Sequence, residues 1–238
     1  MRPSARGPAN ARSTRPESDS DVADVILFHS ALGPRPAVFA LADRLRAAGH
    51  TVHVPDLYAE PEGREGTAGT EGEGGGPRVA DPVITDDPQK AAELVESVGR
   101  EELLRRAIVA AAPHSDRGVV YAGLSLGASL AQTVALGDGR ARGLLLLHGT
   151  ADLPADASAP DLPAQLHIAD PDPFEPHDWQ TAWYLGMRRA GVDLEVFRYP
   201  GAGHLYTDPE LPDHDAEAAE RTLAIALDFL ADIDAAGE

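Results

Sequence analysis

Tyr121–Gly127 reads Tyr-Ala-Gly-Leu-Ser-Leu-Gly, and this stretch places Ser125 in the pattern Gly-x-Ser-x-Gly. The apolar residues from Val119 to Ala122 predict a short buried strand, and the run from Ala128 to Leu136 predicts a helix. A strand that turns directly into a helix forces the residue at the bend into a strained backbone conformation, and flanking glycines remove the Cβ atoms that would clash there. We therefore expect the Ser125 hydroxyl to be exposed at the carboxyl edge of a sheet, beside the free N–H groups of a helix N-terminus.

A serine in this position predicts a nucleophile, which needs a histidine base and an acidic residue later in the chain, in the order Ser, Asp or Glu, His. The segment from Leu194 to Tyr199 has the composition of a strand, and the glycine-rich loop after it ends at His204, the predicted general base. The preceding predicted strand, from Ala164 to Ala169, is followed by Asp170 and Asp172. Either carboxylate could accept the imidazole N–H, and the local pattern separates the two poorly.

Three segments near the start of the chain resemble the opening of the dienelactone hydrolase family, which has the α/β-hydrolase fold. They are Val25 to Gly33, Ala42 to His50 and Val54 to Tyr58. The resemblance resumes at Gly123 to Gly127, at Asp172-Pro173-Phe174 and at Gly203-His204, so that it covers most of the chain from about Asp21 to Leu230.

The resemblance implies roles for individual residues. Ser125 is the implied nucleophile, Asp172 rather than Asp170 the acid, and His204 the base. The implied oxyanion hole consists of the backbone N–H groups of Ala31 and Leu126. We therefore expect no metal in the catalytic site and no cofactor.

Two departures from the family limit what the resemblance implies. The founding enzymes use a cysteine nucleophile, whereas this chain has no cysteine and presents Ser125. The members that cleave dienelactones also carry an arginine shortly after the histidine, where this chain has Asp208, which we expect to repel an anionic lactone. We therefore expect a serine esterase with a catalytic triad that cleaves an ester, lactone or related carbonyl substrate through an acyl-enzyme. We do not expect a dienelactone to be its substrate.

Apolar strand-like segments alternate with helical ones along the chain, which predicts a mostly parallel central sheet with helices on both faces. Further strands are expected at Thr51 to Val54 and Gly143 to Leu147, and helices at Pro36 to Ala48, Glu101 to Ala112, Trp179 to Ala190 and Asp215 to Ile233. We expect a disordered N-terminal tail over residues 1–20 and one α/β-hydrolase domain over residues 21–238. A flexible insertion rich in glycine and glutamate is expected within it at about residues 60–80.

Composition restricts the partners. The chain carries a formal net charge of −19, although its first sixteen residues contain four arginines and no acidic residue. Such an acidic protein is not expected to bind nucleic acid or an anionic membrane surface. No apolar run reaches the roughly 18–20 residues that span a bilayer, and the N-terminal tail lacks the apolar stretch of a targeting signal. We expect a cytoplasmic protein acting on a small molecule; the oligomeric state is left open.

Two other functions are compatible with the sequence. His29, His148 and His167 lie in or beside predicted strands and, with His204, could ligate zinc in a metal-dependent hydrolase, although no metal-binding spacing supports this. A non-catalytic binding protein with a hydrolase fold is the second alternative. The aromatic residues Trp179, Trp183, Tyr184 and Tyr206 could line an acyl pocket or pack in the core, and the turn-rich segment from Asp152 to Pro163 could border that pocket.

Overall fold

A six-stranded sheet forms the centre of the structure, a computed structural model that describes residues 22–59 and 82–237. Its strands run in the order β2-β1-β3-β4-β5-β6, and every neighbouring pair is parallel. The strands are β1 (Asp24–Phe28), β2 (Thr51–His53), β3 (Val119–Leu124), β4 (Gly143–Leu147), β5 (Pro163–Asp170) and β6 (Asp193–Pro200). The predicted parallel sheet is thus confirmed.

The strand order reverses between β1 and β3. The chain places β2 on one side of β1 and then returns to place β3 on the other side. In open parallel sheets, ligands bind beyond the carboxyl ends of the strands at this kind of reversal, because the loops there diverge to opposite sides and leave a crevice. The loops that begin at His29 and Ser125 meet at this point, so the topology itself indicates where a site should form.

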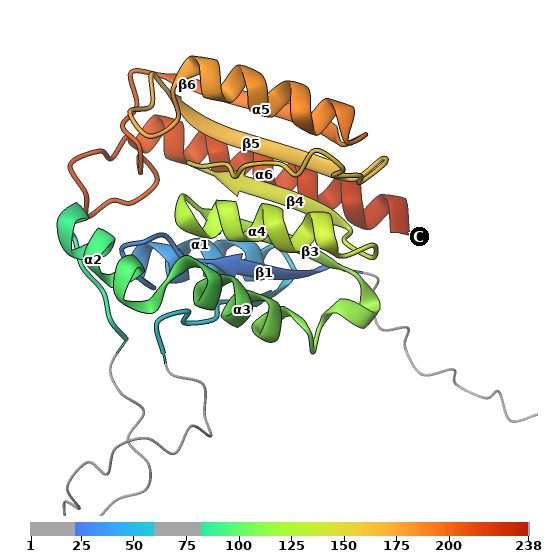
Figure 1. Cartoon of the computed structure of the whole chain (residues 1–238), viewed down its shortest axis with the longest axis horizontal. Helices are drawn as coiled ribbons and strands as arrows, with labels where there is room; N and C mark the ends of the chain where they lie inside the picture. Colours follow the sequence, from blue (N-terminus) through green and yellow to red (C-terminus); the bar gives the residue numbers. More distant parts are fainter. Residues whose placement is uncertain (1–21, 60–81, 238) are drawn as a thin grey trace, which may run out of the picture.

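Helices cover both faces of the sheet (Figure 1). They are α1 (Pro36–Ala47), α2 (Pro88–Val98), α3 (Arg100–Ala111), α4 (Leu126–Gly137), α5 (His177–Arg189) and α6 (Ala216–Gly237). The helices α3, α4 and α5 pack on one face, whereas α1 and α6 pack on the other. This arrangement is the one predicted for an α/β protein.

The two hydrophobic cores follow from the alternation of side chains along each strand. In β1, Ile26 and Phe28 pack in the core beneath α3 and α4, and Val25 and Leu27 pack in the core beneath α1 and α6. All four side chains are fully buried. A strand buried on both faces reads as a continuous apolar run, as β4 does with its sequence Gly-Leu-Leu-Leu-Leu.

The predicted elements are present with boundaries shifted by at most two residues, except that α6 ends four residues later than predicted, but α2 was not predicted. Its start carries a recognisable signal, because the Asp87 side chain accepts hydrogen bonds from the backbone N–H groups of Gln89 and Lys90, and Pro88 takes the first helical position. The helix ends at Val98, and Gly99 alone separates it from α3. This missed helix supplies one wall of the cavity described below.

The predicted tail at residues 1–20 and the predicted insertion at about residues 60–80 lie outside the described residues. Across the part of the chain that is described, no helix combines the length and the apolar character needed to cross a bilayer.

Candidate active site

Ser125 occupies a sharp bend between β3 and α4. Its backbone has φ 52° and ψ −110°, a left-handed conformation that is costly for a residue with a side chain. The two glycines of the motif are required by close packing: a Cβ on Gly123 would overlap the carbonyl oxygen of Gly127, and a Cβ on Gly127 would overlap that of Phe28. The predicted strand–bend–helix unit is therefore present, and α4 begins directly against the end of β1.

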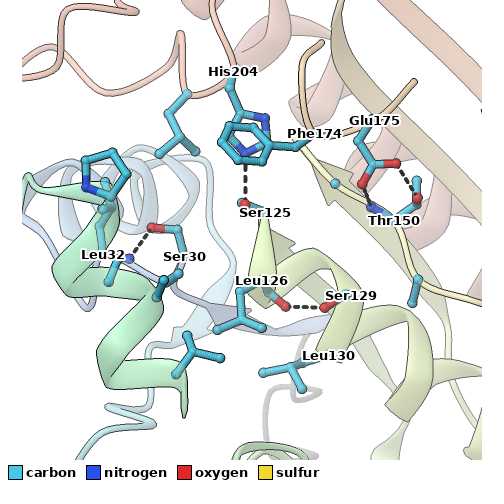
Figure 2. Close-up of a pocket in the computed structure, with 18 of the residues that line it drawn as sticks. Ser30, Leu32, Ser125, Leu126, Ser129, Leu130, Thr150, Phe174, Glu175 and His204 are labelled. Carbon is cyan, nitrogen blue, oxygen red and sulfur yellow. Dashed lines mark hydrogen bonds between the residues drawn. The ribbon is translucent and has the colours of Figure 1, made fainter. Parts of the chain in front are cut away.

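His204 lies directly over the Ser125 hydroxyl (Figure 2). It follows β6 at the carboxyl edge of the sheet, and its Nε2 is 2.9 Å from Ser125 Oγ. The other ring nitrogen, Nδ1, is 2.8 Å from Oδ2 of Asp172 and 3.0 Å from Oδ1. Since a carboxylate only accepts hydrogen bonds, the proton sits on Nδ1 and leaves Nε2 free to accept the serine proton.

The two candidate aspartates take different partners. Asp172 is 3% exposed, and its Oδ1 also accepts a hydrogen bond from the N–H of Phe174, which fixes the carboxylate toward His204. Asp170 instead pairs with His177, with Oδ1 and Nε2 2.8 Å apart, and its backbone carbonyl accepts from Gly201 N–H. The structure therefore brings together Ser125, His204 and Asp172, and holds Asp170 away from them.

The amides of Ala31 and Leu126 both border the cavity into which Ser125 opens. Leu126 is the first residue of α4, where a backbone N–H has no acceptor within the helix. Neither N–H donates a hydrogen bond within the described residues. Two amides that are unpaired beside a hydroxyl can donate to an oxygen that becomes negatively charged there.

Two residues that the sequence did not indicate hold the loop that carries Ala31. Tyr58 donates its hydroxyl proton to the Ala31 carbonyl oxygen at 2.7 Å. His29 uses both ring nitrogens: Nδ1 donates to the Ser30 carbonyl at 2.7 Å and Nε2 accepts from Leu57 N–H at 3.0 Å. No motif could have revealed these roles, because they arise from packing between the loops after β1 and β2.

The cavity beside Ser125 has a volume of about 1160 Å³. One wall is largely apolar and comes from α2, α3 and α4, with Ala91, Val95, Leu104, Leu126 and Leu130 among its residues. The opposite wall carries Phe174, whose ring centroid is 4.5 Å from that of His204, together with Trp179. The Ser125 hydroxyl therefore opens into a cavity whose lining is mostly apolar.

A buried carboxylate stiffens the aromatic side of the cavity. Glu175 accepts hydrogen bonds from the N–H of Thr150 at 2.9 Å and from its hydroxyl at 2.6 Å, as Figure 2 shows. The Thr150 hydroxyl in turn accepts from the indole N–H of Trp179 at 2.8 Å. Hydrogen bonds among these three side chains hold the aromatic wall of the cavity in place, and no sequence pattern predicted these contacts.

The expected role of Asp208 is wrong. Its carboxylate is buried and lies 2.6 Å from Nε of Arg35, so it is neutralised inside the protein and does not border the cavity. In the part of the chain that the structure describes, the acidic groups that border the cavity are Asp86, Glu96, Asp152, Glu175 and Asp213, with one cation, Arg100. The cavity therefore does carry an excess of negative charge, as expected, but residues other than Asp208 supply it.

Only one of the four aromatic residues considered for the acyl pocket lines the cavity. Trp179 does so, whereas Trp183 is buried and donates its indole N–H to Gln132, and Tyr206 is buried against Thr222. Tyr184 is 41% exposed. From the turn-rich segment of residues 152–163, Asp152 borders the cavity.

The histidines considered as zinc ligands serve other purposes. His167 binds the Tyr199 hydroxyl through Nδ1 at 2.8 Å, and burial lowers its pKa to about 3. His148 contacts Thr207 through Nε2 at 2.7 Å, and burial lowers its pKa well below the usual value. Together with the bonds of His29, these contacts leave no cluster of three metal-binding groups around His204 among the described residues.

Comparisons with known proteins agree with this geometry. The model of the dienelactone hydrolase family matches residues 10–233. No curated protein matches the chain.

Solved structures show the same fold at low sequence identity. A dienelactone hydrolase-like promiscuous phosphotriesterase from metagenomic libraries is 20% identical, with a TM-score of 0.69 over 89% of this chain and 86% of that one. A candidate dienelactone hydrolase from Klebsiella pneumoniae is 20% identical, with a TM-score of 0.66 over 90% and 89%. Esterase 2 of Thermogutta terrifontis is 14% identical, with a TM-score of 0.58 over 92% and 87%. Identities this low show the fold alone.

Proposed function

The chain belongs to the dienelactone hydrolase family, a family of hydrolases that act on ester-type bonds, and we propose that it works as a serine esterase through a covalent acyl-enzyme. The observation that carries this proposal is the continuous hydrogen-bonded series from Ser125 through His204 to Asp172. Ser125 has the role of nucleophile, His204 of general base and Asp172 of the acid that orients it. A serine hydroxyl needs such a base because it is a weak nucleophile on its own.

The reaction begins when Ser125 Oγ attacks the substrate carbonyl carbon while its proton passes to Nε2 of His204. The carbonyl oxygen becomes an oxyanion, which the N–H groups of Ala31 and Leu126 stabilise. His204 then protonates the leaving alcohol, and the acyl group stays on Ser125. Water deprotonated by His204 attacks this ester in turn, which releases the acid and restores the serine.

Asp172 contributes by holding His204 in one tautomer. Its carboxylate accepts the Nδ1 proton and stabilises the imidazolium that forms during each proton transfer. Both side chains are nearly inaccessible to water, so the attraction between the carboxylate and the imidazolium is stronger than it would be at the surface.

The cavity favours an ester with an apolar acyl group and without a negative charge. The apolar wall from α2, α3 and α4 offers burial to a hydrocarbon chain, which stabilises binding by about 0.8 kcal/mol for each buried CH₂ group. The described residues place five carboxylates and one arginine around the cavity, and this excess of negative charge raises the electrostatic energy of an anionic substrate. A neutral nitrophenyl butyrate should therefore have a higher kcat/KM than the monoanionic nitrophenyl ester of glutaric acid.

A fluorophosphonate probe tests the proposed function. Such probes label a serine only where a neighbouring base activates it, so we expect one label on the peptide that contains Ser125. Ser125→Ala should abolish labelling, and His204→Ala should slow it strongly. Inhibition by a chelator without labelling would favour the metal-dependent alternative, and absence of both labelling and turnover would favour a binding protein.

A further inference from the structure

Three side chains with metal-binding atoms meet far from the candidate active site. They are Asp24, the first residue of β1, His53, the last residue of β2, and His114, which lies between α3 and β3. One carboxylate oxygen and two ring nitrogens from these residues all lie within 4.8 Å of one another. Within residues 22–59 and 82–237, no other three such groups come this close together.

The arrangement of the three donors is specific. Asp24 Oδ2 lies 3.9 Å from Nε2 of His53 and 4.0 Å from Nδ1 of His114. The two imidazole rings are stacked, with centroids 3.7 Å apart and planes inclined by 29°. Both nitrogens therefore approach the same carboxylate oxygen, at distances too long for hydrogen bonds.

One of these nitrogens is buried without a partner. Nε2 of His53 is inaccessible to solvent and makes no hydrogen bond within the described residues. Buried polar atoms are almost always paired, because an unpaired one loses its hydration without replacement. This atom lies next to a second imidazole and a carboxylate, so its lone pair is available to a ligand that all three groups share.

We propose that Asp24, His53 and His114 form a binding site for a divalent transition metal ion of the zinc type. Two imidazole nitrogens and one carboxylate oxygen suit Zn²⁺, whereas Mg²⁺ and Ca²⁺ prefer oxygen ligands alone. Zinc bonds of about 2.0–2.2 Å in a tetrahedron place ligand atoms about 3.3–3.6 Å apart. The two distances from Asp24 to the histidines need to close by about half an ångström, and the distance between the two histidine nitrogens, which is within 4.8 Å, by no more than about 1.5 Å. Water would take the fourth position.

Among the described residues, Arg117 is the one arginine or lysine that contacts this carboxylate. Its Nη2 lies 3.9 Å from Asp24 Oδ2, and its side chain is 75% exposed. An exposed arginine on a flexible stem can turn into solvent, but while it stays near Asp24 it competes with a metal ion for the carboxylate. Removal of this side chain should therefore strengthen metal binding.

The site is separate from the proposed catalytic residues. Asp24 lies level with Val119, the first residue of β3, whereas Ser125 follows the last residue of that strand. A metal ion at Asp24 would join β1, β2 and the connection between α3 and β3 at the opposite edge of the sheet. Its effect would be on stability, because only the folded chain brings the three ligands together.

Calorimetric titration of the full, untagged chain with Zn²⁺ tests the site. We expect one ion per chain at this site and a rise in Tm when zinc is present. His53→Ala and His114→Ala should each weaken this binding by at least about tenfold and remove the rise in Tm. His177→Ala is the matched control, since it removes a histidine that is paired with a single aspartate, and it should leave both measurements unchanged.

Two results would overturn the proposal. The first is zinc binding of equal strength in the wild-type chain and in the His53→Ala/His114→Ala double variant, or no saturable binding at all. The second is weaker binding in Arg117→Gln, where we expect stronger binding. Both histidines are partly exposed, and circular dichroism without zinc will show that the variants fold before they are titrated.

Discussion

Nδ1 of His204 lies 2.8 Å from Oδ2 of Asp172, although Asp170 stands only two residues earlier in the chain. Asp170 is directed to His177 instead. Asp170 ends β5 and Asp172 lies in the loop after it, so two neighbouring aspartates take different partners, and each can be removed separately.

Asp172→Asn should lower turnover by about 10⁴-fold, because an amide holds the imidazole in the wrong tautomer. Asp170→Asn should keep near-normal turnover and lose about 1 kcal/mol of stability with its bond to His177. Steady-state kinetics and thermal unfolding of both variants measure these effects. Near-normal turnover in Asp172→Asn beside an inactive but folded Asp170→Asn would reverse the assignment.

Tyr58→Phe should lower kcat by roughly five- to tenfold with little change in KM. This fall in kcat corresponds to the loss of one hydrogen bond of about 1 kcal/mol. Burial raises the pKa of Tyr58 to about 12, so its hydroxyl stays protonated and donates to the Ala31 carbonyl throughout the neutral range. Tyr121→Phe is the control, because it removes a comparable hydroxyl that bonds to Asp138. An equal loss of kcat in both variants would show that the Ala31 loop has no special role.

Gly127→Ala should destabilise the protein by at least about 1–3 kcal/mol, because the new Cβ overlaps the carbonyl oxygens of Phe28 and His29 and separates α4 from β1. Gly137→Ala, in the same helix, meets nothing within 4 Å and should be neutral or stabilising by about 0.5–1 kcal/mol. Urea denaturation compares the two variants. Equal stabilities would mean that the bend between β3 and α4 is less tightly packed against β1 than the structure indicates.

Burial of His167 predicts a pH dependence of stability. Its pKa is lowered from 6.5 to about 3, so between these values the unfolded chain binds a proton that the folded chain does not. The free energy of unfolding therefore falls as the pH drops through this range. His167→Gln should make this fall shallower by up to about 1.4 kcal/mol per pH unit between pH 4 and 6. Parallel profiles for the two proteins would contradict the prediction.

The fold could be predicted because its signals are local. The alternation of apolar strands and amphipathic helices indicates a parallel sheet, and the glycines around Ser125 indicate the bend, since both depend on residues close in the sequence. The helix α2 carried a similar signal at Asp87 and Pro88 that the sequence interpretation overlooked.

The wall of the site could not be predicted in the same way, because it depends on contacts between distant segments. Arg35 and Asp208 are 173 residues apart, and nothing near Asp208 indicates that its charge is neutralised. Trp179 and Trp183 lie one turn apart on α5, yet one borders the cavity and the other packs in the core. Helical periodicity places both residues on one face of α5, and it does not distinguish a residue that lines a pocket from one that packs in the core.

The most direct test is to trap the acyl-enzyme. Rapid mixing of the enzyme with excess nitrophenyl butyrate, an acid quench and mass spectrometry of the peptides should show a butyryl group on the peptide with Ser125, formed in a burst of nitrophenol before steady turnover. Ser125→Ala should show neither the adduct nor the burst, and its turnover should fall by several orders of magnitude. Undiminished turnover in Ser125→Ala, or steady hydrolysis by the wild type with the adduct on another residue, would contradict the proposed nucleophile.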